Sequence, residues 1–122
     1  MKKKTDFPGA FSLRPRFRVM RGDKIAFGPG KLELLELVAE TGSISDAAKR
    51  MDMSYMRAWS LIQTINACFK LPLVQTARGG NERGGAELTA AGRRVLKLYR
   101  QMEQISLHAT ADLWNQLKQF MR

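Results

Sequence analysis

Residues 42–60 read GSISDAAKRMDMSYMRAWS, a stretch with two helix starts separated by a short helix and a tight turn. Ser43 and Ser54 are residue types that cap helix N-termini, and Asp46, three residues after Ser43, comes close to a capping box. Asp52 is one of the few non-glycine residue types that tolerate a left-handed backbone. The stretch therefore predicts a helix over 44–51, a turn at 52–53 and a longer helix from Tyr55 to about Phe69.

The longer helix has one apolar face and one polar face. Residues at helical spacing form an apolar stripe, which predicts the side that faces the core: Ala58, Leu61, Ile62, Ile65 and Phe69. Polar and aromatic side chains lie largely off this stripe: Tyr55, Arg57, Ser60, Gln63 and Thr64. Trp59 borders the stripe. We expect the polar face to be exposed from the first turn of the helix onward.

The flanking sequence predicts a further helix and two hairpins. Alternation over 16–20 is typical of a half-buried strand, with a turn at 21–24 and a return strand over 25–27. A helix over 31–40 ends at Thr41-Gly42. After residue 69, a strand over 71–76, a glycine-rich tip over 77–87 and a return strand at 86–88 form the second hairpin.

The last helix is expected to begin after Thr89 and to run to about residue 120. Its apolar residues recur every three or four positions: Val95, Leu98, Met102, Ile105, Ala109, Leu113, Leu117 and Phe120. A helix of ~30 residues spans ~45 Å, more than one small domain can cover. The pattern predicts a C-terminal dimerisation helix over about 90–120; a single helix that lies across its own domain with a frayed end is the alternative.

The charge of the chain is large and segregated. The net charge is +10. Residues 1–24 carry eight basic side chains against two acidic ones, and residues 78–100 carry six against two. Such segregation favours nucleic acid or anionic lipid as the partner. We expect residues 1–15 to form a basic flexible N-terminal arm, whose bland alternative is a solvated tail, and residues 16–122 to form one domain.

The composition argues against catalytic, metal-bound and membrane-bound classes. One cysteine excludes an internal disulfide and a cysteine-based zinc site, and one histidine removes most metal and acid–base designs. We expect the lone Cys68 to be at least half-buried. No apolar run approaches the roughly 18 residues of a membrane-spanning helix, and no apolar stretch of a secretory signal follows Met1. The expectation is a cytoplasmic protein that is not an enzyme, holds no cofactor or metal and does not bind a membrane.

The order of these elements is that of a winged helix-turn-helix, in a fold that is mainly α with small β ribbons. In this fold the second helix of the motif presents its first turn to the major groove of double-stranded DNA. Arg57 can bond a guanine, Tyr55 a phosphate, and Met56 can touch a thymine methyl. Ser60 and Gln63 could reach a base edge or a phosphate. Free backbone N–H groups at the helix starts, with Ser43 and Ser54, can hold phosphates.

The glycine-rich tip suits the wing of such a fold. Arg78, Asn81 and Arg83 fit phosphates or a narrow minor groove, and Gly79 and Gly80 let the backbone approach closely. A nucleotide-binding loop fails, because the glycine pair at 84–85 is followed by alanine rather than by Lys-Ser/Thr. A mobile, solvated hairpin loop is the bland alternative.

Four motifs resemble the DNA-binding domain of ModE-type, molybdate-responsive transcriptional regulators, which are related to LysR-like winged helices. They are Gly42-Ser43-Ile44-Ser45 with Ala48-Lys49, Ser54-Tyr55 with Ala58-Trp59, Arg78-Gly79-Gly80 through Gly84-Gly85-Ala86, and Leu88-Thr89 with Gly92. The resemblance covers about residues 16–105 and implies a homodimeric regulator. It places Ser45 in the helix-turn-helix as a phosphate contact or merely a helix-start residue, and gives Trp59 the role of orienting the recognition helix.

The chain departs from this family in three places. Met56 stands where a basic residue is common, which either changes the sequence preference or passes the charge contact to Arg57, and Asp52 stands where a turn glycine is common. The chain stops after its long helix, as in the short, stand-alone form of the family, so molybdate is not expected to bind it directly. A protein-interaction module and an oxyanion-responsive regulator are the alternative functions.

The wing assignment gives a first prediction. Arg83→Ala should flatten the salt dependence of DNA binding, because one phosphate contact fewer releases fewer counterions; the slope of log K against log salt should fall by about 1. Titrations at several salt concentrations measure this slope. An unchanged slope would remove the wing from the interface.

Overall fold

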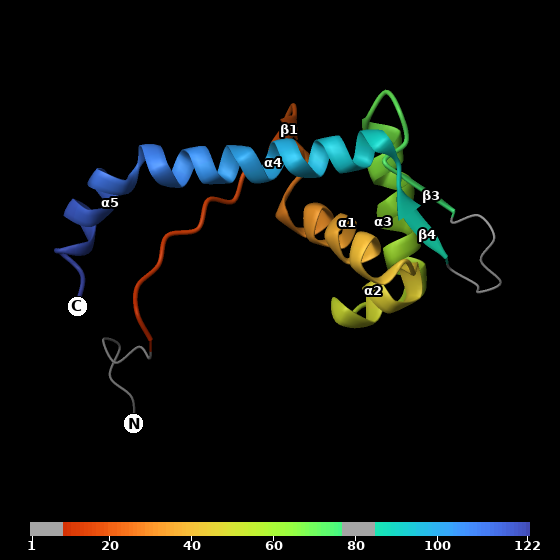
Figure 1. The fold of residues 1–122 in the computed structure, drawn as a ribbon, viewed down its shortest axis with the longest axis horizontal. Coiled ribbons are helices and arrows are strands. Elements are labelled where there is room, and N and C mark those ends of the chain that lie inside the picture. The colour runs from red at the N-terminus through yellow and green to blue at the C-terminus, as the bar shows by residue number, and fades with distance from the viewer. Residues whose placement is uncertain (1–8, 77–84) are drawn as a thin grey trace.

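The computed structural model describes residues 9–76 and 85–122 of the chain, and the fold is mainly helical. In chain order the elements are β1 (Val19–Arg21), β2 (Lys24–Phe27), α1 (Pro29–Thr41), α2 (Ile44–Arg50), α3 (Tyr55–Cys68), β3 (Val74–Thr76), β4 (Ala86–Leu88), α4 (Ala90–Ala109) and α5 (Ala111–Lys118). Helices α1–α3 gather at one end, with the β3–β4 ribbon beside them, and α4 runs across this group and beyond it (Figure 1). The predicted architecture of helices with two small antiparallel ribbons is confirmed.

The core lies among α1, α2, α3 and the ribbons. Small residues let α2 approach both neighbours closely, since Ala47 and Ala48 of α2 and Ala58 of α3 are all but inaccessible to solvent. Larger side chains close the core around them: Leu32, Leu34, Leu35, Val38, Ile62, Ile65 and Leu73. The predicted stripe of α3 is confirmed, with Leu61 and Phe69 partly buried at its edges.

The predicted caps form as the sequence indicates. The Ser43 hydroxyl accepts a hydrogen bond from the backbone N–H of Asp46 (3.0 Å), and the Ser54 hydroxyl accepts one from that of Arg57 (3.1 Å). Asp52 has a φ of 56°, the left-handed conformation that the tight turn requires. Gly42 ends α1 with a φ of 67°. The two caps and the left-handed Asp52 define where α2 ends and α3 begins, and so set how α3 follows α2.

The β3–β4 ribbon is fastened to the ends of α3 and α4. The Asn66 side-chain oxygen accepts from the backbone N–H groups of Leu73 (2.9 Å) and Val74 (3.1 Å), and its amide donates to the Val74 carbonyl (3.0 Å). Thr89 caps α4 and donates to the Pro72 carbonyl (2.7 Å). The strand predicted over 71–76 is shorter, Val74–Thr76, because residues 72 and 73 serve these helix ends instead of a strand ladder.

An aromatic cluster joins the β1–β2 hairpin to α3 and α4. The ring of Phe27 packs edge-to-face on Phe69 and Tyr99, and the Tyr99 hydroxyl donates to the Phe17 carbonyl (2.6 Å). Burial raises the pKa of Tyr99, in keeping with a hydroxyl that stays protonated and donates. The prediction of a half-buried strand over 16–20 was wrong: β1 starts at Val19 and is exposed throughout, because the hairpin packs on the core through Phe27 of β2 and leaves the β1 side chains outside.

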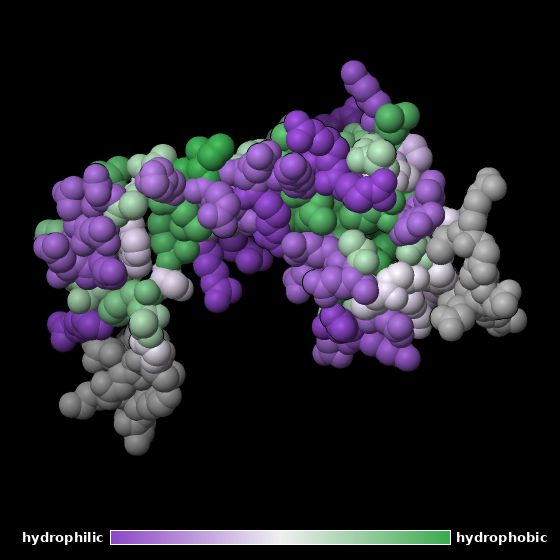
Figure 2. Space-filling view, viewed as in Figure 1, coloured by the Kyte–Doolittle hydropathy of each residue, from purple (hydrophilic) through white to green (hydrophobic). Residues whose placement is uncertain are grey.

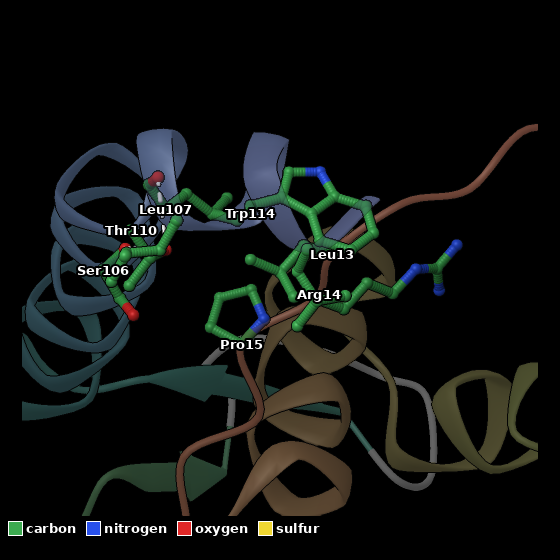
Figure 3. Close-up of a pocket in the computed structure, with 9 residues that line it drawn as sticks. Leu13, Arg14, Pro15, Ser106, Leu107, Thr110 and Trp114 are labelled. Atoms are coloured by element: carbon green, nitrogen blue, oxygen red, sulfur yellow. Dashed lines mark hydrogen bonds between the residues drawn. The ribbon is translucent and has the colours of Figure 1, made fainter. Parts of the chain in front are cut away.

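The prediction of a single helix over about 90–120 was wrong, because this segment forms two helices, α4 and α5, that are separated at Thr110. The Thr110 hydroxyl donates to the carbonyl of Ser106 four residues earlier (2.7 Å), a bond that competes with regular helix geometry. Trp114 on α5 then faces Leu13 and Pro15 across a hollow of about 310 Å³ (Figure 3). Residues 9–15 of the predicted arm have no regular secondary structure, and residues 1–8 lie outside the described residues.

Cys68 is exposed rather than half-buried, and its thiol points to the Ala26 carbonyl at 3.5 Å. Among the described helices, none combines the length and apolar character needed to cross a membrane.

The seat of α4 on β3 gives a stability prediction. A Cβ at Gly92 would lie 2.2 Å from the Leu73 carbonyl oxygen, so Gly92→Ala forces backbone apart and should destabilise the fold by about 2 kcal/mol or more. Gly30→Ala is the matched control, because nothing lies within 4 Å of its Cβ position and alanine suits a helix better. Urea unfolding measures both. Equal stability of Gly92→Ala and the parent chain would contradict the tight contact.

Candidate nucleic-acid interface

The first turn of α3 projects into solvent from a buried base. Tyr55, Met56 and Arg57 are all exposed, Met56 by 70%, while the next residue, Ala58, is fully buried. The Ser54 hydroxyl caps the helix by accepting a hydrogen bond from the Arg57 backbone N–H, so the cap does not use the side chains of Tyr55, Met56 and Arg57. A rigid, capped helix end that presents a cation, a phenol and a thioether is a surface suited to binding rather than to packing.

The polar face continues along α3. Ser60 and Gln63 are exposed, as predicted. Trp59 is 44% exposed and lies one helical turn after Tyr55, so the two rings are neighbours on the helix surface. The sequence placed Trp59 at the border of the apolar stripe, and the family resemblance gave it the role of orienting the recognition helix, which stays a prediction. Its spacing of four from Tyr55 was the signal that could have placed it on the exposed face.

The start of α2 lies against the base of the wing. The Gly42 carbonyl accepts a hydrogen bond from the backbone N–H of Ala86 (3.1 Å), and Ser43 forms an isolated bridge with Gly85. Ser43 and Ser45 are both half-buried at this junction. Ser43 uses its hydroxyl as the helix cap. The structure therefore brings the helix-turn-helix and the ribbon base together at one edge of the domain.

The tip of the wing connects Thr76 to Gly85. The predicted contact residues Arg78, Gly79, Gly80, Asn81 and Arg83 lie outside the described residues. The ribbon that carries the tip is in regular register, with Val74 opposite Leu88 and Thr76 opposite Ala86. Figure 1 shows the ribbon beside α3 on the side away from α5. The tip therefore starts from the same edge of the domain as α2 and α3.

Arg57 takes part in none of the ion pairs found among the described residues. Arg50 pairs with Glu40 at 3.0 Å on the surface, a contact of little energetic weight. Arg100 is held between Glu36 and Glu103, and the hydrogen bond that it donates to Glu36 raises its pKa further above the ordinary arginine value. Arg100 therefore braces α4 against α1, whereas the exposed Arg57 has no such role in the fold.

Within residues 9–76 and 85–122, no group of three or more His, Cys, Asp or Glu side chains is arranged to hold a metal ion. The hollow beside α5 has mostly apolar walls, and the Arg14 guanidinium points away from Ser106 and Thr110 (Figure 3). The exposed face of α3, with the cap donors and the basic wing sequence, is instead the geometry that a DNA groove accepts.

Comparison with known proteins agrees with this geometry. Residues 29–93 match the family described as "Bacterial regulatory helix-turn-helix protein, lysR family". The chain is 41% identical over 78 residues to the molybdenum transport protein ModE of Azotobacter vinelandii, covering 64% of this chain and 29% of that protein. It is 40% identical over 86 residues to the DNA-binding transcriptional dual regulator ModE of Escherichia coli (strain K12), covering 70% and 33%. The resemblance to ModE-type regulators is confirmed, over about a third of those relatives' length.

A solved structure shows the same fold with DNA. The CbnR_DBD–DNA complex superposes with a TM-score of 0.55 at 25% identity, covering 72% of this chain and 95% of that chain. The full-length CbnR complex with its target DNA gives a TM-score of 0.52 at 26% identity, covering 71% and 28%.

Proposed function

The chain belongs to the LysR family of bacterial regulatory helix-turn-helix proteins, and we propose that it regulates transcription by binding duplex DNA sequence-specifically as a homodimer. The observation that carries the proposal is the first turn of α3, where Tyr55, Met56 and Arg57 stand exposed on a capped and buried base. Similarity to ModE regulators, and to CbnR as solved in two complexes with DNA, supports the same partner. A DNA partner would place the protein in the cytoplasm.

In this proposal α3 enters the major groove and the contacts divide by chemistry. Arg57 reads a guanine through two donors, Met56 contacts a thymine methyl, and Tyr55 bonds a phosphate. Ser60 and Gln63 serve the part of the groove farther along the helix. The start of α2, with Ser43 and Ser45, and the wing residues Arg78, Gly79, Gly80, Asn81 and Arg83 hold the flanking backbone or minor groove.

The proposed dimer uses the outer face of α4. Leu98, Met102 and Ile105 recur at spacings of four and three and are exposed, Ile105 by 68%. Figure 2 shows hydrophobic surface along the part of α4 that extends beyond the helix-turn-helix. An apolar stripe of this spacing favours pairing with a second helix. Two-fold pairing would present two α3 helices to a roughly palindromic site.

Molybdate is not part of the proposed activity of these residues. The hollow beside α5 is walled mostly by apolar side chains, and the Arg14 guanidinium at its edge points away from Ser106 and Thr110 (Figure 3). Such a hollow suits an oxyanion poorly, because a buried anion needs charges or donors that converge on it.

Selection of genomic fragments on the purified protein tests the proposed function directly. Enrichment of a common, roughly palindromic sequence is the expected result, and recovery of random fragments alone would refute sequence-specific binding. The selected fragment then serves as the specific DNA in the following measurements.

Arg57→Ala should lower affinity for the selected site by about 1–3 kcal/mol and relax preference at one base pair. Fluorescence anisotropy on the selected and on a random duplex measures both effects. Arg94→Ala, at an exposed arginine of α4, is the matched control and should alter both affinities equally. If Arg57→Ala loses the same factor on both duplexes, Arg57 contacts only phosphate.

Ile105→Glu should weaken the dimer by at least about tenfold, because it places a carboxylate in an apolar interface. Gln104→Glu adds the same charge at a neighbouring exposed position off the stripe and should leave the dimer intact. Sedimentation across a concentration series measures the association constant. A parent chain that stays monomeric, or a dimer that tolerates Ile105→Glu, would contradict the role of this stripe.

A further inference from the structure

The β1–β2 hairpin sits at the opposite end of α3 from the base-reading turn. Phe27 of β2 packs on Phe69, which directly follows α3, at 5.4 Å between ring centroids. The Cys68 thiol, at the last residue of α3, reaches the Ala26 carbonyl of β2. Because α3 has 14 residues, the hairpin lies roughly 21 Å along the helix axis from Tyr55. The DNA contacts proposed for α3 run from its first turn to Gln63, and the hairpin lies beyond them at the C-terminal end of the helix.

Exposed cations lie in this hairpin and just before it, and we call them the hairpin patch: Arg16 and Arg18, which precede β1, with Arg21 of β1 and Lys24 of β2. Asp23 is the one carboxylate in the same stretch of sequence. The patch residues take part in none of the ion pairs found among the described residues. Beside them, a hollow of about 260 Å³ is lined by Arg16, Arg18 and Lys31 without an acidic side chain. Arg16 also lines a second hollow together with Glu33 and Glu36, so Arg18, Arg21 and Lys24 are the patch residues away from these two carboxylates.

The register of the hairpin makes this charge costly to keep. Arg21 is directly opposite Lys24 in the ladder, and like charges at opposite positions destabilise a sheet pair. A two-stranded ribbon is marginally stable on its own and has little energy to spare for repulsion. The ribbon is held by its aromatic anchor at Phe27, which needs none of the cations. The cations are therefore not explained by the fold, and a polyanion would relieve their repulsion.

We propose that the hairpin patch binds the phosphate backbone of a second DNA segment, so that protein seated through α3 holds two duplexes together. This inference rests on the proposed function. A duplex is stiff over about 150 base pairs, which makes a separate segment the occupant rather than the operator itself bent around the domain. This binding would use phosphates and show no base preference, because the patch offers positive charge but no helix that could enter a DNA groove.

The test captures one duplex with another. A biotinylated duplex carrying the selected site is immobilised and saturated with protein, unbound protein is washed away, and a fluorescent random duplex is added. The parent chain should retain the fluorescent duplex in a salt-sensitive manner. Arg21→Gln/Lys24→Gln should reduce that retention by at least about fivefold while leaving loading on the immobilised duplex within about twofold. Lys118→Gln/Arg122→Gln removes the same charge from exposed positions at the C-terminal end and should retain the second duplex.

Failure of the hairpin patch and failure of the proposed function give different results in this experiment. If protein loads normally on the immobilised duplex but retains no fluorescent duplex, the proposed role of the hairpin patch is overturned and the proposed function stands. If no protein loads on the immobilised duplex, the proposed function itself is overturned. Retention that survives Arg21→Gln/Lys24→Gln assigns bridging to the two α3 helices of a dimer and also overturns the inference. Because Met20 and Ile25 are exposed beside the cations, vesicles with phosphatidylserine form a further arm. Hairpin-dependent binding to vesicles without second-duplex capture would assign the patch to lipid and overturn the proposal.

Discussion

The close approach of α2 to α1 and α3 is the constraint on which the rest of the structure depends. Ala47 and Ala48 leave room for two helix backbones, and Ala58 supplies the matching small residue on α3. A larger side chain at any of these positions would push α3 outward, since packed interiors absorb little extra volume. The orientation of the exposed first turn of α3 thus follows from three methyl groups in the core, one of them on Ala58, which directly follows Arg57.

A second constraint places the wing. Asn66 of α3 satisfies three backbone groups at the start of the ribbon, two on Val74 and one on Leu73 just before β3, and Gly92 lets α4 close on Leu73 from the other side. The ribbon is therefore fixed at its root by two helices, although each of its strands has only three residues. A short ribbon with a rooted base can carry a glycine-rich tip without needing a large sheet for support.

Features set by neighbours in sequence could be predicted, and features set by tertiary contacts could not. The caps at Ser43 and Ser54 and the left-handed Asp52 follow from local chemistry, and the exposed first turn of α3 follows from helical spacing. The break at Thr110 did not, because the apolar repeat continues through it while a threonine hydroxyl bonds back to Ser106. The predicted burial of Cys68 failed for a related reason: its position beside the apolar stripe says nothing about how far the hairpin covers it.

The break at Thr110 also changes what α4 can do for a dimer. A continuous helix would have offered one stripe from Val95 to Phe120, longer than the domain beside it. With the break, α5 turns toward residues 13–15, and Trp114 is shared with the N-terminal segment instead of the stripe. In the proposed dimer, the stripe on α4 would pair close to the aromatic cluster that ties Tyr99 to Phe17 and Phe27. A short seam braced by the core would transmit subunit spacing to α3 more rigidly than a long, unsupported helix, and that spacing would set the separation of the two half-sites.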